Sequence, residues 1–194
     1  MYAITIKPHW AWAILHAGKR VENRDFLPPA LVGQRVALHA GRPLGGATAE
    51  ARALRALAAF LARAGYPAAA VWLKGQRPTL WWTSESARED GPSLVEAARI
   101  AAMAASEKKA GEVFSATPVT ADHFLTSCVV ATADVLPYST RIQGHEEIWR
   151  HWHRQGAWLI PGCKAPWALC NVKFLAEPVP CAGQQGVWQW RGDA

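Results

Sequence analysis

Strand-like segments near both ends of the chain constrain its fold more than any other feature. The stretch YAITIK at 2–7 alternates apolar residues with small or polar ones, the period of two that is typical of a half-buried strand. GQRVALHAG at 33–41 predicts another strand, with Val36 and Leu38 on one face and His39 on the other. Further strands are predicted over 127–135, 166–174 and 186–190. Strands at both ends predict an α+β domain whose termini meet in one sheet or barrel.

The middle of the chain, residues 42–123, has helical character instead. From 47 to 65 apolar residues recur at the spacing of one helix face, at Leu54, Leu57, Ala58 and Leu61, with arginines opposite. A capping-box pattern at 93–96 predicts the start of a second helix, which ends with two lysines before Gly111. Residues 71–92 contain Pro and Gly breaks and are interpreted as loop-like. We therefore expect a single domain spanning 1–194, with 42–123 as a mainly helical insertion.

Two shorter helices are predicted outside this block. Residues 10–17 are rich in Ala, Ile and Leu, and Gly18 stands where a helix end favours a residue that tolerates positive φ. Residues 145–156 form the second, with a glycine as its stop. Between the first helix and the next strand, residues 19–24 are interpreted as an extended segment.

The composition of the chain indicates which classes of partner and which cellular location are to be expected. A chain of 194 residues with a formal charge of +6 and eleven tryptophans favours an anionic partner, nucleic acid among them, since indole faces stack on bases. Neither a membrane span nor a signal segment is evident, which favours a cytoplasmic protein. The four cysteines form no CxxC pair, so reduced and mostly buried thiols are expected.

Several chemistries find no support in the sequence. The sequence contains no phosphate-binding loop motif and no dinucleotide-binding fingerprint. It also contains no GxSxG motif, which would indicate a serine nucleophile. His145, His151 and His153, with Cys163 nearby, raise the question of a metal. His151 and His153 are a single histidine pair in a predicted helix, where residues two apart diverge, so no metal is expected. No cofactor is expected either.

The charged segment after Gly18 is the candidate binding element. Lys19 and Arg24 are cations that reach phosphates, Asn23 offers a paired donor and acceptor, and Glu22 accepts from an exocyclic amine. On a regular strand Lys19 and Glu22 would face opposite ways, so they converge only if the helix exit twists the segment. The alternative is a solvated edge strand with alternating charge, and spacing alone favours that alternative.

The stretch IKPHWAWAILHAGKRVENRDF, followed by VGQRVALHAG, resembles the opening of an ASCH domain, a relative of the PUA fold. In that family a strand, a PWA-type helix start, a Gly-Lys-x-x-Glu-x-Arg segment and a strand ending in His-Ala recur. The closing PWALCNVKFLAEPVPCAGQQGVW is similar to the C-terminal part of the EOLA-like branch. The resemblance covers about 1–41 and 124–190.

The resemblance implies a PUA-like, partly open β-barrel with rim helices, and a cleft beside the first helix that takes RNA or a modified nucleoside or nucleotide. By motif position Lys19, Glu22 and Arg24 line this cleft, with Trp10, Trp12 and His39 beside it. Stacking by one of the tryptophans and base-edge reading by Glu22 and Asn23 would then bind the base.

Other members of the family resemble amidohydrolases that remove an acyl group from N4-acylated cytidine, and some resemble ribonucleases. Lys19 matches the lysine of such a site, whereas Glu22 stands where a threonine is usual, and Glu146 is a candidate for a later acid. Binding therefore ranks first and hydrolysis, with Lys19 and Glu22 as catalytic residues, second. A third alternative is a scaffold that binds a protein partner through 42–123.

Overall fold

The computed structural model describes residues 1–66, 68–71, 77–82, 117–138 and 155–192. The chain divides into two compact units, one made of Met1–Pro43 with Leu125–Ala194 and the other of Leu44–Phe124. The boundaries fall next to residues 42 and 123, where the strand-rich ends of the sequence give way to the Ala-rich middle. Of the helices that the structure describes, none is long and apolar enough to cross a membrane.

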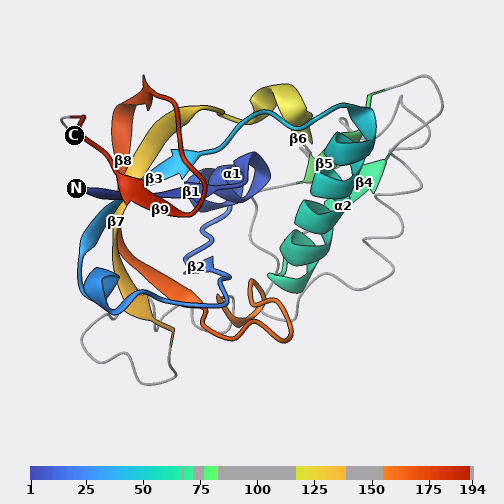
Figure 1. Ribbon diagram of the computed structural model, residues 1–194. Coiled ribbons are helices and arrows are strands. Elements are labelled where there is room, and N and C mark those ends of the chain that lie inside the picture. Colours follow the sequence, from blue (N-terminus) through green and yellow to red (C-terminus); the bar gives the residue numbers. More distant parts are fainter. Residues whose placement is uncertain (67, 72–76, 83–116, 139–154, 193–194) are drawn as a thin grey trace. The chain divides into compact units, whose positions relative to one another are not determined.

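The first unit is built on a curled six-stranded sheet with helix α1 (Pro8–His16) beside it (Figure 1). The strand order is β2-β8-β7-β3-β1-β9, and only the β1–β3 pair is parallel, because α1 lies in the connection between these strands. The strands of this sheet are β1 (Tyr2–Ile6), β2 (Val21–Glu22), β3 (Arg35–Ala40), β7 (Cys128–Pro137), β8 (Trp167–Pro180) and β9 (Val187–Gln189). This confirms the α+β class, and a curled sheet of this kind is consistent with a partly open barrel.

The two ends of the chain meet in the sheet, as the strand pattern predicts. Strand β9 pairs with β1, and Tyr2 lies opposite Gln189. The backbone N–H of Trp190 donates to the carbonyl of Met1, at 2.8 Å. Register shifts at Leu38/His39 in β3 and twice between β7 and β8 bend these strands, which accounts for the curl.

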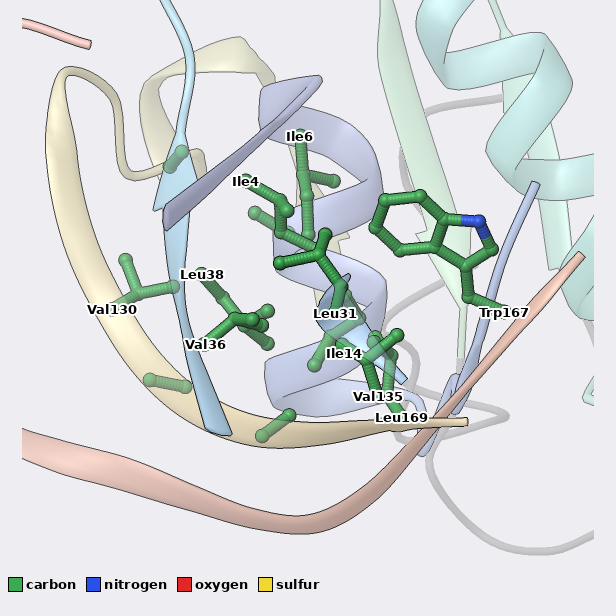
Figure 2. Packing of buried hydrophobic residues seen from close by; sticks show 14 of the residues in the cluster. Ile4, Ile6, Ile14, Leu31, Val36, Leu38, Val130, Val135, Trp167 and Leu169 are labelled. Carbon is green, nitrogen blue, oxygen red and sulfur yellow. The ribbon is translucent and has the colours of Figure 1, made fainter. Parts of the chain in front are cut away.

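The main core fills the space between the concave face of the sheet and α1 (Figure 2). Strand residues alternate as expected, so that Ile4, Ile6, Val36 and Leu38 point inward. The larger side chains of this core are Ile4, Ile6, Ile14, Leu31, Val36, Leu38, Val130, Val135, Trp167 and Leu169. A smaller cluster, made of Ala3, Ala37, Val129, Trp188 and Trp190, covers the opposite face. The sheet is therefore packed on both sides.

The predicted elements of this unit are largely confirmed, with shifted ends. Helix α1 starts at Pro8, which both stops β1 and takes the first helical turn, where the missing N–H of proline costs nothing. Of residues 19–24 only Val21–Glu22 pair as a strand, against β8. The helix predicted over 145–156 lies almost wholly outside the described residues.

The second unit packs helix α2 (Ala47–Arg63) on a three-stranded sheet of β4 (Ala68–Val71), β5 (Thr79–Trp82) and β6 (Thr117–Val119). Leu54, Leu57, Ala58 and Leu61 are buried, as the helical spacing predicts. The loop interpretation of 71–92 is wrong where β5 lies, because pairing with β4 and β6 overrides the proline and glycine breaks around it. The helix predicted to begin at 93 lies outside the described residues.

Candidate functional site

A glycine corner joins helix α1 to strand β2 and sets up the charged segment. Gly18 has φ +64°, a left-handed conformation that favours glycine, as its place at the helix end predicts. Beyond it the N–H of Lys19 donates to the carbonyl of Ala13 at 3.1 Å, and the guanidinium of Arg20 donates to the carbonyl of Ile14 at 2.9 Å. A cation at this end of a helix is favourable because the last carbonyls carry partial negative charge.

The corner brings Lys19, Glu22 and Arg24 together in one ionic network. Lys19 Nζ lies 3.3 Å from Glu22 Oε2 and also donates to the carbonyl of Val21. The other carboxylate oxygen, Oε1, lies 3.0 Å from Nε of Arg24, whose terminal nitrogen donates to the carbonyl of Thr5 at 2.6 Å. The twist on which convergence depends is thus present, and one carboxylate is shared by two cations.

This network is largely withdrawn from water. Lys19 is 1% exposed and Glu22 is 6% exposed, so the solvated edge strand that spacing favoured is wrong for these two residues. Burial lowers the pKa of Lys19, since charging it costs more away from water, while Glu22 acts in the opposite direction and Arg24 adds to the lowering. A buried lysine next to a carboxylate is an arrangement that both structural ion pairs and active sites use.

A second buried base lies on α1 close to the network. Burial, together with Lys7 and Lys19, lowers the pKa of His9 to about 3. The imidazole therefore stays neutral at pH 7. Its ring packs against that of Trp10, with 4.5 Å between ring centroids.

Two indole rings flank the cations. Lys19 Nζ lies 5.8 Å from the ring centroid of Trp10, which is half-buried, and the guanidinium carbon of Arg24 lies 5.7 Å from that of Trp167. Trp12 is buried and packs against His16 instead. Of the two tryptophans that the sequence offered, Trp10 is the one beside the charges.

A buried glutamine from another part of the chain holds the corner in place. Gln155, 4% exposed, accepts from the N–H of Arg20 at 2.8 Å and donates to the carbonyl of Gly18 at 2.9 Å. The oxygen and the nitrogen of its side-chain amide thus both form hydrogen bonds with the backbone on either side of Lys19. Sequence reasoning missed this residue, because nothing in its neighbourhood distinguishes it from a solvent-exposed glutamine.

The side-chain amide of Asn23, like that of Gln155, forms hydrogen bonds with backbone groups. Its amide donates to the carbonyl of Trp158 and accepts from the N–H of Ile160, both at 2.9 Å. The carbonyl of Arg24 accepts from the N–H of Ala165 at 2.9 Å. The amide expected to read a base edge therefore anchors the 158–160 segment.

His39 lies on the opposite face of the sheet from the ionic network. Its Nε2 donates to the carbonyl of Cys181 at 3.2 Å, and its Nδ1 lies 3.3 Å from Thr5 Oγ1. The ring meets that of Trp188 edge-on, and burial lowers its pKa. The structure thus brings Trp10, Lys19, Glu22 and Arg24 together and leaves His39 and Trp12 out of that group.

Trp167 is the aromatic partner that sequence reasoning placed only in a strand. Glu22 lies opposite Trp167 in the β2–β8 pairing, and the indole N–H donates to the carbonyl of Phe26 at 3.1 Å. No sequence signal could have found it, because β2 and β8 are far apart in the sequence and only their pairing brings Glu22 and Trp167 together.

Within the described ranges no group of three or more His, Cys, Asp or Glu side chains could hold a metal ion. Glu146 and the histidines at 145, 151 and 153 lie outside those ranges. All four cysteines are free thiols, with Cys128 and Cys170 buried and Cys163 and Cys181 half-buried.

Comparison with known proteins adds no assignment. No protein-family model matches this chain, and no curated protein is similar to it in sequence.

Proposed function

We propose that the first unit binds a nucleobase beside α1, in RNA or in a modified nucleoside or nucleotide. The observation that carries the proposal is the Glu22 carboxylate, 6% exposed and shared by Lys19 and Arg24, with the half-buried ring of Trp10 beside Lys19. Burying charges costs several kcal/mol per ion unless they are well paired, and replacing such a network by apolar side chains is often neutral or stabilising. A role in binding therefore explains the presence of these buried charges better than a contribution to stability does.

Each group has a chemical role in this proposal. Trp10 provides an aromatic face on which a base can stack. Glu22 accepts a hydrogen bond from an exocyclic amine, and Lys19 donates to a ring nitrogen or carbonyl. Arg24, with its side chain 27% exposed, is the cation that reaches a phosphate.

Asn23 and Gln155 act as positioning residues rather than as contacts with the base. Their amides are engaged with backbone groups of the corner and of the 158–160 segment. Rigid support of this kind holds binding groups in place before the ligand arrives, which limits the entropy lost on binding. The curled sheet with α1 beside it is, in the same proposal, a PUA-like barrel of the ASCH type.

A second candidate is an amidohydrolase that acts on N4-acylated cytidine, and the contact between Lys19 and Glu22 favours it. Glu22 would take a proton from water as the water oxygen attacks the amide carbonyl carbon. The Lys19 ammonium would stabilise the negative oxygen that forms. The bond from carbon to N4 then breaks as the proton passes to N4, which gives a carboxylic acid and cytidine.

The test is a titration of the full chain with cytidine, N4-acetylcytidine and a short single-stranded RNA at low salt, followed by calorimetry. Arg24→Ala is the test variant and Arg35→Ala the control, because Arg35 also forms an ion pair, with Asp134, and the two side chains are 27% and 32% exposed. A lost charge-assisted hydrogen bond corresponds to about 1.5–3 kcal/mol, so Arg24→Ala should weaken binding of the RNA, the probe that carries phosphates, about tenfold or more.

Release of acetate from N4-acetylcytidine is measured in parallel. If the natural chain releases acetate and the Glu22→Gln variant does not, the hydrolase is favoured. Binding without release of acetate would reject the hydrolase. Equal affinities of the Arg24 and Arg35 variants for the RNA, or no binding of any of the three probes, would reject the proposal for this face of the unit.

A further inference from the structure

A pocket of about 670 Å³ lies where β1 and β3 end, on the face of the sheet opposite α1. Thr5 and His39 point to this face because their neighbours Ile4, Ile6 and Leu38 point into the main core. A volume of this size is within the range of about 300–1,000 Å³ that small-molecule sites occupy. The lining residues are Thr5, His39, Gly41, Arg42, Ser127, Cys181, Ala182, Gly183, Gln184 and Gln185.

The wall formed by residues 181–185 is fixed to the strands. Thr5 Oγ1 donates to the carbonyl of Gln184 at 2.5 Å and accepts from the indole N–H of Trp188 at 3.1 Å. The carbonyl of Cys181 accepts from His39. A side chain at Gly183 would collide with the His39 ring, so the backbone itself lies against the imidazole. The pocket is therefore preformed.

The charged and polar side chains of the lining indicate which chemical group a ligand would carry. Arg42 is the one lysine or arginine among the lining residues, and none of them is acidic. Arg42 is exposed, and its guanidinium has no ion pair or hydrogen bond within the part of the chain that the structure describes. Hydroxyl and amide groups of Ser127, Gln184 and Gln185 lie in the same lining. Such a set suits an oxyanion, which a guanidinium can bind through two parallel hydrogen bonds.

We propose that this pocket is a second ligand site, which binds a small organic molecule whose phosphate or carboxylate group pairs with Arg42. The volume is too large for an inorganic anion alone, so the rest of the ligand contacts the other residues of the lining. The site does not depend on the nucleobase proposal, because it uses the other face of the sheet and shares no charged side chain with the network of Lys19, Glu22 and Arg24.

Two half-buried cysteines provide a test within the same chain. Cys181 lines the pocket, whereas Cys163 lies at the other site, with its thiol 3.0 Å from the carbonyl of Arg24. Alkylation of each by iodoacetamide is followed by mass spectrometry while ribose 5-phosphate, gluconate or uncharged ribose is added at constant ionic strength. The first two probes separate phosphate from carboxylate, and ribose reports binding that needs no anion.

We expect ribose 5-phosphate or gluconate to slow the alkylation of Cys181 and leave Cys163 unchanged. Arg42→Ala should raise the concentration needed for half-protection about tenfold, the effect of losing one charged hydrogen bond. Arg191→Ala, which removes another exposed arginine of this unit that does not line the pocket, should leave it unchanged.

The proposal is overturned by any of four results. The first is no protection by either anion at concentrations on the order of 10 mM. The others are equal protection by ribose, full protection in the Arg42→Ala variant, and alkylation of Cys181 as slow as that of the buried Cys170, which would mean that the pocket is closed.

Discussion

Replacing Glu22 by glutamine tests whether the buried ionic network behaves as its geometry requires. The substitution keeps the shape of the side chain and removes its charge, so Lys19 and Arg24 lose their common counter-ion. At the effective dielectric constant of about 20 that suits protein sites, an ion pair at 3.3 Å has a Coulomb energy of about 5 kcal/mol. Removing one partner of a buried pair typically costs about 3–5 kcal/mol.

The loss has a ceiling because Lys19 can release its proton. At pH 7 deprotonating a lysine with an ordinary pKa of 10.5 costs about 5 kcal/mol, and at pH 9 it costs about 2 kcal/mol. Arg24 is partly solvated and contributes less. We therefore expect Glu22→Gln to lower the free energy of unfolding by about 3 kcal/mol at pH 7, a large part of the ~5–15 kcal/mol of a typical domain.

The sign of the pH dependence follows from proton counts. In the variant the folded state holds Lys19 with fewer protons than the unfolded state does, so its stability rises with pH up to the unfolded pKa. The deficit relative to the natural chain should thus shrink between pH 7 and pH 9. Lys19→Met in the same background removes the buried charge and should recover at least half of the loss.

Urea denaturation followed by tryptophan fluorescence measures these differences. A Glu22→Gln deficit below about 1 kcal/mol at pH 7 would mean that Lys19 and Arg24 find other partners. A double variant whose loss equals the sum of the single losses would refute the reasoning, because Lys19 and Glu22 would then not interact.

Two further predictions concern the same corner. His9 is neutral when folded, with its pKa lowered to about 3, and takes up a proton on unfolding below pH 6.5, so acidification through this range should cost up to about 1.4 kcal/mol per pH unit. His9→Gln should remove this component of the pH dependence in urea titrations, and unchanged slopes would contradict it. Gly18→Ala should cost about 1–2 kcal/mol because φ is +64°, measured as a lower urea midpoint. Gly156→Ala is the control, since Gly156 has open space around it and no positive φ, and an equal loss in both would contradict the argument.

The two proposed sites occupy opposite faces of one sheet. Thr5 connects them, because its carbonyl accepts from Arg24 while its hydroxyl donates to the carbonyl of Gln184. Each site has its own aromatic partner, since Trp10 of α1 lies beside Lys19 and Trp188 of β9 meets the ring of His39.

Periodicity was sufficient for the strands of the first unit and for α2, but not for the strands of the second unit. The alternation in 2–6 and 35–40 and the helical spacing in α2 predict buried faces that the structure confirms, because side-chain direction follows from local backbone geometry. Strand β5 was missed, since its pairing with β4 and β6 is not encoded in its own few residues. Local signals cannot report partners that are distant in sequence.

The sequence by itself determined the helix that ends just before Gly18, the order of the charges that follow and the strands that close the sheet. Only the tertiary structure decided that Lys19 and Glu22 turn inward and that their network lies on the face of the sheet away from His39. It also decided that Asn23 and Gln155 hold the corner and that Trp167 lies beside Arg24. The reason is that burial and hydrogen-bond partners depend on segments more than 130 residues apart, such as Asn23 and Trp158, which meet only when the sheet is assembled.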